Sequence, residues 1–393
     1  MKPRMIWAAL SVLLVLTLAA ACGTQQAAEP DAAGPAQDEL PAEFSRIAEV
    51  WELLREEHIK GDSLDPQAIS NGAIRGMLEA LNDPYASYLD SRQFEIANQD
   101  LKGYFEGIGA EVTLRNGHIT VLAPLPDTPA EKAGIRPGDI ILAIEGESAE
   151  NISLLQAVNK IRGQKGTTVT LLVLHLGDTD PVSIEVTRGV IPLVSVRLIM
   201  LDGGIGHMRL SSFSATTKRE LLQSLDRFRD SGGVGLVLDL RDNPGGLLTS
   251  VVDVTSQFLD DGLVLYQIDA HDHRRDWKVE AGGKALDIPL VVLVNQFSAS
   301  ASEVFSGALM DHGRATVVGI KTFGKGSVNN LWPLDDGSGV NFTVANWYTP
   351  NGTLIEGEGI TPNIVLEPVE DFSTDAHLER AVEVLREQIA QEN

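Results

Sequence analysis

The stretch that decides the fold covers residues 288–331 and reads IPLVVLVNQFSASASEVFSGALMDHGRATVVGIKTFGKGSVNNL. Residues 288–294 are a short apolar run rich in valine, leucine and isoleucine, which predicts a strand buried on both faces. From Glu303 onward apolar residues recur at helical spacing, and residues 315–320 are again strand-like. The stretch therefore predicts a strand, a sharp turn, a helix and a second strand, followed by a lysine between glycines.

Three serines alternate with alanine at the predicted strand-to-helix turn. The first amides of a helix have no internal partners, so they would stabilise an anion that forms beside a serine oxygen there. Such a serine needs a base, and Lys325 between Gly324 and Gly326 is a candidate, because a desolvated lysine gives up its proton more readily. The structural alternative is that the serines cap the helix and the lysine lies in a solvated turn.

Several motifs of the chain resemble those of the C-terminal processing peptidases, a family of PDZ-containing serine proteases with a Ser-Lys dyad. They are S-A-S-A-S-E at 298–303, D-H-G-R-A at 311–315, T-F-G-K-G at 322–326 and L-D-L-R-D-N-P-G-G at 238–246. The resemblance implies that Ser300 is the nucleophile and that Lys325 is the general base. It also implies an α/β protease core, which the alternation of predicted strands and helices from residue 190 onward favours as well.

Two further positions carry a role only through this resemblance. Asp311 lies where some members have a functionally important aspartate, with a helix-end carboxylate as the alternative. Asn329 stands where members commonly have a glutamine that orients the lysine, so either Asn329 orients Lys325 or that role is vacant.

Backbone amides are the expected oxyanion donors. Gly245 and Gly246 follow a predicted buried strand and expose their N–H groups, so they are candidates for one half of the oxyanion hole. The N–H of Ala301, directly after the nucleophile, is the candidate for the other half. Because the chain itself supplies nucleophile, base and oxyanion donors, we expect no metal and no organic cofactor.

Histidine chemistry is the main alternative for the base. The chain has eight histidines, so a Ser-His-Asp arrangement is compatible with composition, but none lies in a motif that demands it. His271 and His273 sit in a charged segment that we interpret as a solvated loop, with a metal site as the alternative.

Residues 102–189 are predicted to form a PDZ domain. Alternating strands flank a hairpin turn at Asn116 and Gly117, and A-G-I-R-P-G-D at 133–139 resembles a segment of PDZ domains. A PDZ domain adds a peptide strand to its sheet edge and holds the terminal carboxylate on loop amides. The resemblance thus implies binding of protein C-terminal tails by Gly107, Ile108 and Gly109. A β-domain that merely stabilises the protease is the alternative.

The N-terminus has the pattern of a secretory signal, with basic residues before an apolar run over 5–21. Three alanines precede Cys22, the only cysteine, which resembles a bacterial lipoprotein box with alanine where leucine is usual. We expect lipidation of Cys22 and a location outside the cytoplasm, on the outer face of the cytoplasmic membrane. Plain cleavage after an A-x-A site and a permanent transmembrane anchor are the alternatives.

The chain of 393 residues is long enough for several domains. The expected parts are a signal peptide over 1–22, a disordered linker over 23–43, a helical N-terminal region over 44–101, the PDZ domain over 102–189, the protease core over 190–370 and a C-terminal helix over 371–393. Helices are predicted over 44–59 and 66–81. The segment A-L-N-D-P-Y-A-S-Y-L-D at 80–90 is interpreted as packing or dimerisation, not chemistry.

Composition limits the partners. The net charge of −24 argues against binding of nucleic acid, which needs basic patches. The sequence predicts a serine endopeptidase that captures the C-terminal tail of a protein substrate and cleaves near it. A membrane-tethered PDZ adaptor with a weak or inactive protease core is the competing class, and a homo-oligomer is an open alternative.

Overall fold

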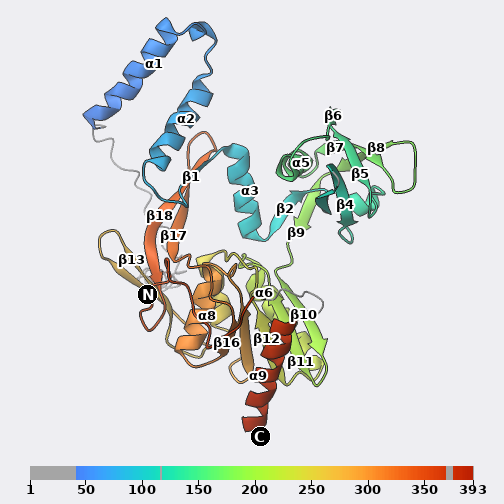
Figure 1. Ribbon diagram of the computed structural model, residues 1–393, viewed down its shortest axis with the longest axis vertical. Helices are drawn as coiled ribbons and strands as arrows, with labels where there is room; N and C mark the ends of the chain where they lie inside the picture. The colour runs from blue at the N-terminus through green and yellow to red at the C-terminus, as the bar shows by residue number, and fades with distance from the viewer. Residues whose placement is uncertain (1–40, 116, 369–374, 393) are drawn as a thin grey trace, which may run out of the picture. The chain divides into compact units, whose positions relative to one another are not determined.

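The computed structural model describes residues 41–115, 117–368 and 375–392 and has a mixed α/β fold, as predicted (Figure 1). Its contacts divide the chain into residues 1–70 and 71–393, which are described separately. The apolar N-terminal run, Cys22 and Asn116 lie outside the described residues. In the described ranges, no helix is both long and apolar enough to cross a bilayer.

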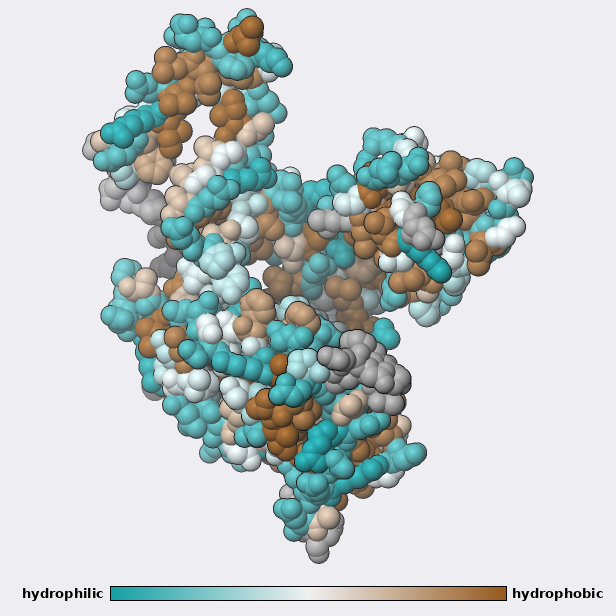
Figure 2. All heavy atoms as spheres, in the orientation of Figure 1, coloured by the Kyte–Doolittle hydropathy of each residue, from teal (hydrophilic) through white to brown (hydrophobic). Residues whose placement is uncertain are grey.

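The described part of residues 1–70 carries the first predicted helix, α1 (Ser45–Glu57), between 3-10 turns at Ala42–Phe44 and Gly61–Ser63. Apolar side chains recur here every three residues and remain more than one-third exposed, namely those of Phe44, Ile47, Val50 and Leu53. Figure 2 shows brown, hydrophobic atoms along this helix. The helix is therefore amphipathic with a partly uncovered apolar face.

The region expected to be wholly helical also contains a strand. Helices α2 (Pro66–Glu79) and α3 (Ser91–Lys102) agree with expectation, and α3 begins at a capping box made by Asp90 and Gln93. Between them, β1 (Ser87–Leu89) pairs antiparallel with β18 (Gly339–Tyr348). Three residues are too few to show a strand period in the sequence, and the partner lies about 250 positions away.

The predicted PDZ region is a β-rich domain. Its larger sheet has the order β3-β4-β5-β7-β8, with β6 beside β5. The bounds are β3 (Ala110–Arg115), β4 (His118–Pro124), α4 (Pro129–Lys132), β5 (Ile140–Ile144), β6 (Glu147–Ser148), α5 (Leu154–Ile161), β7 (Thr168–Leu174) and β8 (Val182–Thr187). The domain is entered through β2 (Tyr104–Gly107) and left through β9 (Gly189–Pro192), and these two strands pair antiparallel. Its own buried cluster of isoleucine, valine and leucine makes it an independent core.

The predicted protease core is built on a six-stranded sheet with the order β10-β11-β12-β15-β16-β19. Strands β11 to β19 run parallel along this order, and β10 is antiparallel at the edge. The bounds are β10 (Val196–Leu201), β11 (Ile205–Leu210), β12 (Gly235–Asp239), β15 (Leu290–Val294), β16 (Thr316–Gly319) and β19 (Ile364–Val365). All five residues of β12 and of β15 are buried, which confirms the expectation of strands covered on both faces.

Helices cover the two faces of this sheet (Figure 1). Side chains of α6 (Thr217–Asp230), α7 (Leu248–Thr255) and α8 (Ala301–Asp311) pack on one face. Side chains of α9 (Ala376–Glu392) pack on the other, where Leu385 joins Val237 and Val291. The loops at the carboxyl ends of β12 and β15 are thus the place where α/β sheets commonly bind ligands.

A second sheet carries the general-base candidate. It has the order β1-β18-β13-β14, and β17 pairs with β18. Its remaining strands are β13 (Leu263–Asp269), β14 (Arg274–Lys278) and β17 (Ser327–Pro333). Lys325 lies two positions before β17, so the β17–β18 hairpin sets where the lysine enters the site.

Candidate active site

Ser300 lies at the turn between β15 and α8, as predicted, and it is the residue directly before the helix. Its φ is 57° and its ψ is −116°, a conformation that a non-glycine residue rarely adopts. Such strain costs on the order of 1–3 kcal/mol and is typical of functional turns that hold a side chain in a fixed place. The same geometry is known for serine nucleophiles on strand-to-helix turns.

The three serines of the turn have different partners. Ser298 donates a hydrogen bond to the carbonyl of Leu240 at 2.8 Å, and Ser302 donates one to the carbonyl of Asn243 at 2.9 Å. Both side chains are fully buried and fasten the turn to the loop after β12. Among the described residues, no acceptor receives a hydrogen bond from the Ser300 hydroxyl. The middle serine is therefore the one with a hydroxyl free to react.

Glu303, in the first turn of α8, is a site residue that the sequence reasoning missed. Its side chain is fully buried and accepts hydrogen bonds from the N–H groups of Ser300 (2.8 Å), Gly324 (2.6 Å) and Lys325 (2.8 Å), and from the Thr322 hydroxyl (2.6 Å). Burial raises the pKa of Glu303, although these hydrogen bonds oppose the shift. The carboxyl group thus joins the nucleophile's backbone to the lysine's backbone. The S-x-x-E spacing of a capping box was the signal that could have identified it.

The glycines around Lys325 allow a close approach of two backbone segments. A Cβ on Gly326 would lie 2.2 Å from the nitrogen of Glu356, and one on Gly324 would lie 3.2 Å from the carbonyl carbon of Gly357. The Gly326 N–H also donates to the Glu356 carboxylate at 2.8 Å. Side chains at 324 and 326 would therefore push Lys325, which is half-buried, out of its place.

The two glycines proposed as oxyanion donors differ in the structure. A Cβ on Gly245 would lie 2.7 Å from the Cβ of Ser300 and 2.9 Å from the nitrogen of Ala301, so this glycine borders the nucleophile directly. Its N–H, however, donates to Asn243 Oδ1 at 2.9 Å. Gly245 is thus a correction to the predicted donor set, because its amide is already engaged. For Gly246 and Ala301 the donor role stays a prediction.

Neither Asp311 nor Asn329 forms a hydrogen bond with Lys325 among the described residues. Asp311 is the last residue of α8, about 16 Å of helix from Ser300, and its carboxylate accepts the N–H of Asn351 at 2.8 Å. That position suits the helix-end alternative. Asn329 accepts a hydrogen bond from the Ser327 hydroxyl and donates one to Thr343 Oγ1, each at 3.2 Å. Its side chain is one methylene shorter than that of glutamine, and it bonds to its neighbours in the hairpin, so its orienting role stays a prediction.

Comparison with known proteins identifies the family. Residues 204–366 match the model of peptidase family S41. The chain is 35% identical over 326 residues to the carboxy-terminal processing protease CtpA of Bacillus subtilis, covering 83% of this chain and 69% of that protein. The chain belongs to peptidase family S41. It is a C-terminal processing serine protease with a PDZ domain that binds substrate.

Two further family models match other parts of this S41 peptidase. Residues 120–174 match the model of the PDZ domain, and residues 6–93 match the model of the N-terminal domain of the activating protease CtpB. The protease CtpB of Bacillus subtilis is 36% identical over 354 residues, covering 89% of this chain and 73% of that protein. Among solved structures, the photosystem II D1 C-terminal processing protease aligns with a TM-score of 0.51 and 30% identity, covering 88% of this chain and 98% of that chain.

The PDZ domain of this S41 peptidase has a groove suited to an extended tail. Strand β3 is an edge strand, so its free side can pair with a peptide strand. A cavity of about 290 Å³ lies beside it, lined mainly by apolar residues that include Val112 of β3 and Val158 of α5. Ile108, from the predicted carboxylate-binding loop, also lines this cavity, and Gly109 has a φ of 78°. Ile108 thus places this loop beside the groove, and the binding of a tail carboxylate by the loop stays a prediction.

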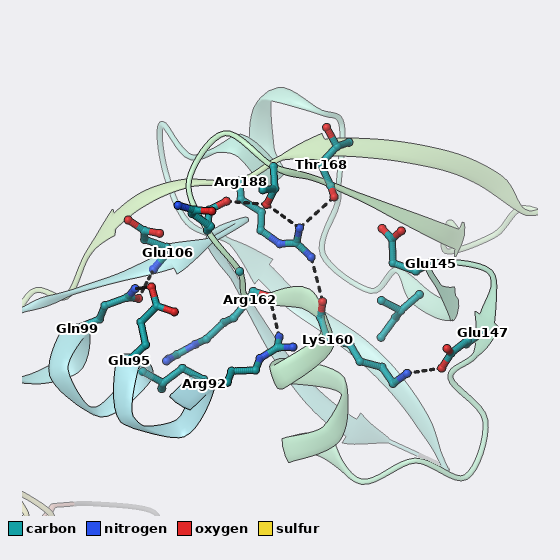
Figure 3. A pocket seen from close by; sticks show the side chains of 15 residues that line it. Arg92, Glu95, Gln99, Glu106, Glu145, Glu147, Lys160, Arg162, Thr168 and Arg188 are labelled. Carbon is teal, nitrogen blue, oxygen red and sulfur yellow. Dashed lines mark hydrogen bonds and ion pairs between the residues drawn. The ribbon is translucent and has the colours of Figure 1, made fainter. Parts of the chain in front are cut away.

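A larger cavity of about 590 Å³ lies between α3 and the PDZ domain and is lined mainly by charged and polar side chains (Figure 3). The arginine side chains that line it already make hydrogen bonds or ion pairs with the protein. Arg188 donates to the carbonyls of Lys160 at 3.1 Å and Thr168 at 3.0 Å, and Arg162 pairs with Asp100 at 3.2 Å. None of the residues singled out for catalysis lines this cavity, so its size does not make it the active site.

The histidine alternative finds no support at the nucleophile. His207 pairs with the fully buried Asp239 at 2.9 Å, and Arg241 pairs with the same carboxylate at 2.7 Å. Within the described residues, no histidine hydrogen-bonds to Ser300, and no group of three or more histidine, cysteine or acidic side chains could hold a metal ion.

Proposed function

We propose that Ser300 and Lys325 form the catalytic dyad of this protease. The proposal is carried by one observation: the Glu303 carboxyl group accepts the N–H groups of both residues and so holds two distant segments at one site. The chain supports no competing nucleophile in the turn, because Ser298 and Ser302 donate their hydroxyl hydrogens to backbone carbonyls.

In the first step, the Lys325 amine, in its neutral form, takes the proton from the Ser300 hydroxyl as Oγ attacks the scissile carbonyl carbon. The N–H groups of Ala301 and Gly246 donate hydrogen bonds to the oxyanion of the tetrahedral intermediate. Lys325 then returns the proton to the leaving amine, which gives an acyl-enzyme on Ser300. In the second step, Lys325 takes a proton from the water that attacks this ester and passes it to Ser300 Oγ as the C–Oγ bond breaks, which releases the shortened substrate.

The PDZ domain supplies the tail-binding step. The edge strand β3 and the loop at Gly107, Ile108 and Gly109 hold the substrate's C-terminal segment, and the apolar cavity beside α5 receives its terminal side chain. An apolar terminal residue suits this cavity, because burial of an aliphatic side chain contributes about 1.5–3 kcal/mol.

Cleavage of a reporter protein with an apolar C-terminal tail tests the dyad. Purified wild-type protein should cleave it, whereas Ser300→Ala and Lys325→Ala should not, with unchanged thermal unfolding. Cleavage by Ser300→Ala at the wild-type rate would overturn the dyad. Tail binding without cleavage in the wild type would favour the adaptor function instead.

We further propose that the protein acts outside the cytoplasm as a lipoprotein on the outer face of the cytoplasmic membrane. The basic residues before the apolar run over 5–21 and the position of Cys22 support this proposal. Cys22→Ala should move the protein from the membrane fraction to the soluble fraction. Retention of that variant in the membrane would argue for an uncleaved anchor.

Self-association through α1 is a separate proposal. Ile47, Val50 and Leu53 are about half exposed along one side of the helix, and pairing with a second copy would bury them. Sedimentation of the wild type should show a dimer or larger species, and Val50→Asp should reduce it to monomer. A wild-type monomer at micromolar concentration would contradict this.

A further inference from the structure

Tyr85 places its aromatic ring under the amine of Lys325. The distance from Lys325 Nζ to the ring centroid is 4.5 Å, within the range at which a ring face attracts a cation. Tyr85 belongs to the segment between α2 and β1, which the sequence suggested was there for packing or dimerisation. The structure instead brings it to the candidate general base.

Hydrogen bonds to β18 hold the Tyr85 backbone in this position. The Asp83 carboxylate accepts the N–H of Tyr85 and the N–H of Thr343, each at 2.9 Å. The Tyr85 carbonyl accepts a hydrogen bond from the Asn341 side chain at 3.0 Å. Because β18 pairs with β17, which begins just after Lys325, the ring and the lysine are fixed to the same hairpin.

Among the described residues, no other side chain is seen to orient the amine. Asn329, at the position where the resemblance places an orienting amide, bonds to Ser327 and Thr343. We propose that Tyr85 is the positioning residue of this site: its ring face attracts the ammonium that Lys325 becomes as it takes the Ser300 proton, and so holds the amine in the direction of Ser300. This inference rests on the proposed dyad and adds the group that orients its base.

The ring face, not the hydroxyl, carries this role. Within the described residues, the Tyr85 hydroxyl makes no hydrogen bond. Burial, together with the carboxylates of Glu356, Glu303 and Asp83, raises the pKa of Tyr85, so the phenol stays neutral at working pH. Tyr85 also borders a cavity of about 390 Å³ beside Ser327 and Phe342, so its ring is not enclosed on all sides by packing.

The test compares Tyr85→Phe with Tyr85→Leu on the tailed reporter protein. Phenylalanine keeps the ring face and should leave kcat within about twofold of wild type, whereas leucine should lower kcat roughly tenfold and leave KM nearly unchanged. If both variants lose activity equally, or if leucine leaves kcat unchanged, the proposal is wrong.

Tyr88 provides a matched control in the same segment. Its ring is 7% exposed and faces Arg75 at 5.2 Å from the ring centroid. Tyr88→Leu should lower the thermal unfolding temperature without changing kcat, because its cation takes no part in the proposed chemistry. A loss of kcat in Tyr88→Leu equal to that in Tyr85→Leu would assign the effect to packing and overturn the proposal.

A fluorinated phenylalanine series at position 85 tests the proposal even if the leucine variant does not fold. Each added fluorine weakens the attraction of the ring face for a cation with little change in shape. Successive fluorination should lower kcat stepwise, and a flat series would refute the role of the ring. Lys325→Ala, measured in parallel, separates the two hypotheses: if it is active, the dyad fails, and if it is inactive while the series is flat, only the role of Tyr85 fails.

Discussion

The carboxyl group of Glu303 accepts a hydrogen bond from the backbone N–H of Lys325 at 2.8 Å, across 22 positions of sequence. This contact joins the start of α8 to the loop before β17, and the same carboxyl group accepts the N–H of Ser300. Since the group is fully buried, its donors have no water to replace it. The alignment of the proposed nucleophile and base therefore depends on a side chain that need not touch substrate.

Glu303→Gln should impair the enzyme while preserving its fold. Glutamine offers one acceptor oxygen and an NH2 group, so at least one backbone N–H would face a donor in place of an acceptor. We expect kcat to fall roughly tenfold or more and the free energy of unfolding to fall by about 1–3 kcal/mol. Glu358→Gln, an exposed carboxylate on a neighbouring loop, is the control and should change neither. Wild-type kcat in Glu303→Gln would remove Glu303 from the site.

Ser298→Ala and Ser302→Ala should retain catalysis. Each change removes one buried hydrogen bond, so the free energy of unfolding should fall by about 1–3 kcal/mol. Cleavage of the tailed reporter should continue with both variants, in contrast to Ser300→Ala. Complete inactivation of a folded Ser298→Ala variant would show that the nucleophile has been assigned to the wrong serine.

Gly245→Ala should abolish activity, because its new Cβ would lie 2.7 Å from that of Ser300 at a φ of 103°. Gly313→Ala is the matched control, since Gly313 has a φ of 63° and no heavy atom lies within 4 Å of the Cβ that alanine would add there. That control should lose roughly 1 kcal/mol of stability from backbone strain and keep its kcat. Steady-state rates and thermal unfolding of both variants distinguish the steric clash with Ser300, which only Gly245→Ala introduces, from the backbone strain at positive φ, which both variants share.

The free energy of unfolding should fall at acid pH, because Asp239 becomes protonated there. Burial alone would raise the pKa of Asp239, but hydrogen bonds from His207 and Arg241 outweigh it and lower this pKa to about 2. A carboxyl group with a lowered folded-state pKa stabilises the fold above its unfolded pKa, near 4, and loses that contribution as the pH falls toward 2. Urea unfolding should lose roughly 2 kcal/mol over this range, and Asp239→Asn should show a smaller loss. Equal pH dependence in both proteins would contradict the assignment.

Val158→Asp tests the tail groove. This side chain lines the apolar cavity beside β3, so a carboxylate there should raise KM for the tailed reporter. Cleavage of a short peptide that lacks a PDZ-binding tail should be unchanged. An equal loss on both substrates would indicate damage to the core.

Local patterns predicted most of the protease core. The strands near 235–239 and 290–294 are continuous apolar runs, and α8 follows a turn with a recognisable cap, so their type is readable within a few residues. Ser300 and Lys325 lie in motifs that resemble a known family. These features depend on nearby residues and need no knowledge of the fold.

The missing parts depend on distant pairing. Strand β1 pairs with the distant β18, and hydrogen bonds from Thr343 and Asn341 of β18 to Asp83 and Tyr85 bring the Tyr85 ring to Lys325. The sequence suggested that the N–H of Gly245 is available, but the side-chain oxygen of Asn243, two positions earlier, accepts a hydrogen bond from it. Turn hydrogen bonds of this kind are decided by backbone conformation, which sequence spacing does not specify.

The most direct measurement is mass-spectrometric identification of the residue acylated by a slow ester substrate after acid quenching. The account predicts a single acyl group on Ser300, and no acyl group in Lys325→Ala. Acylation of another residue, or full acylation of Ser300 without Lys325, would contradict it.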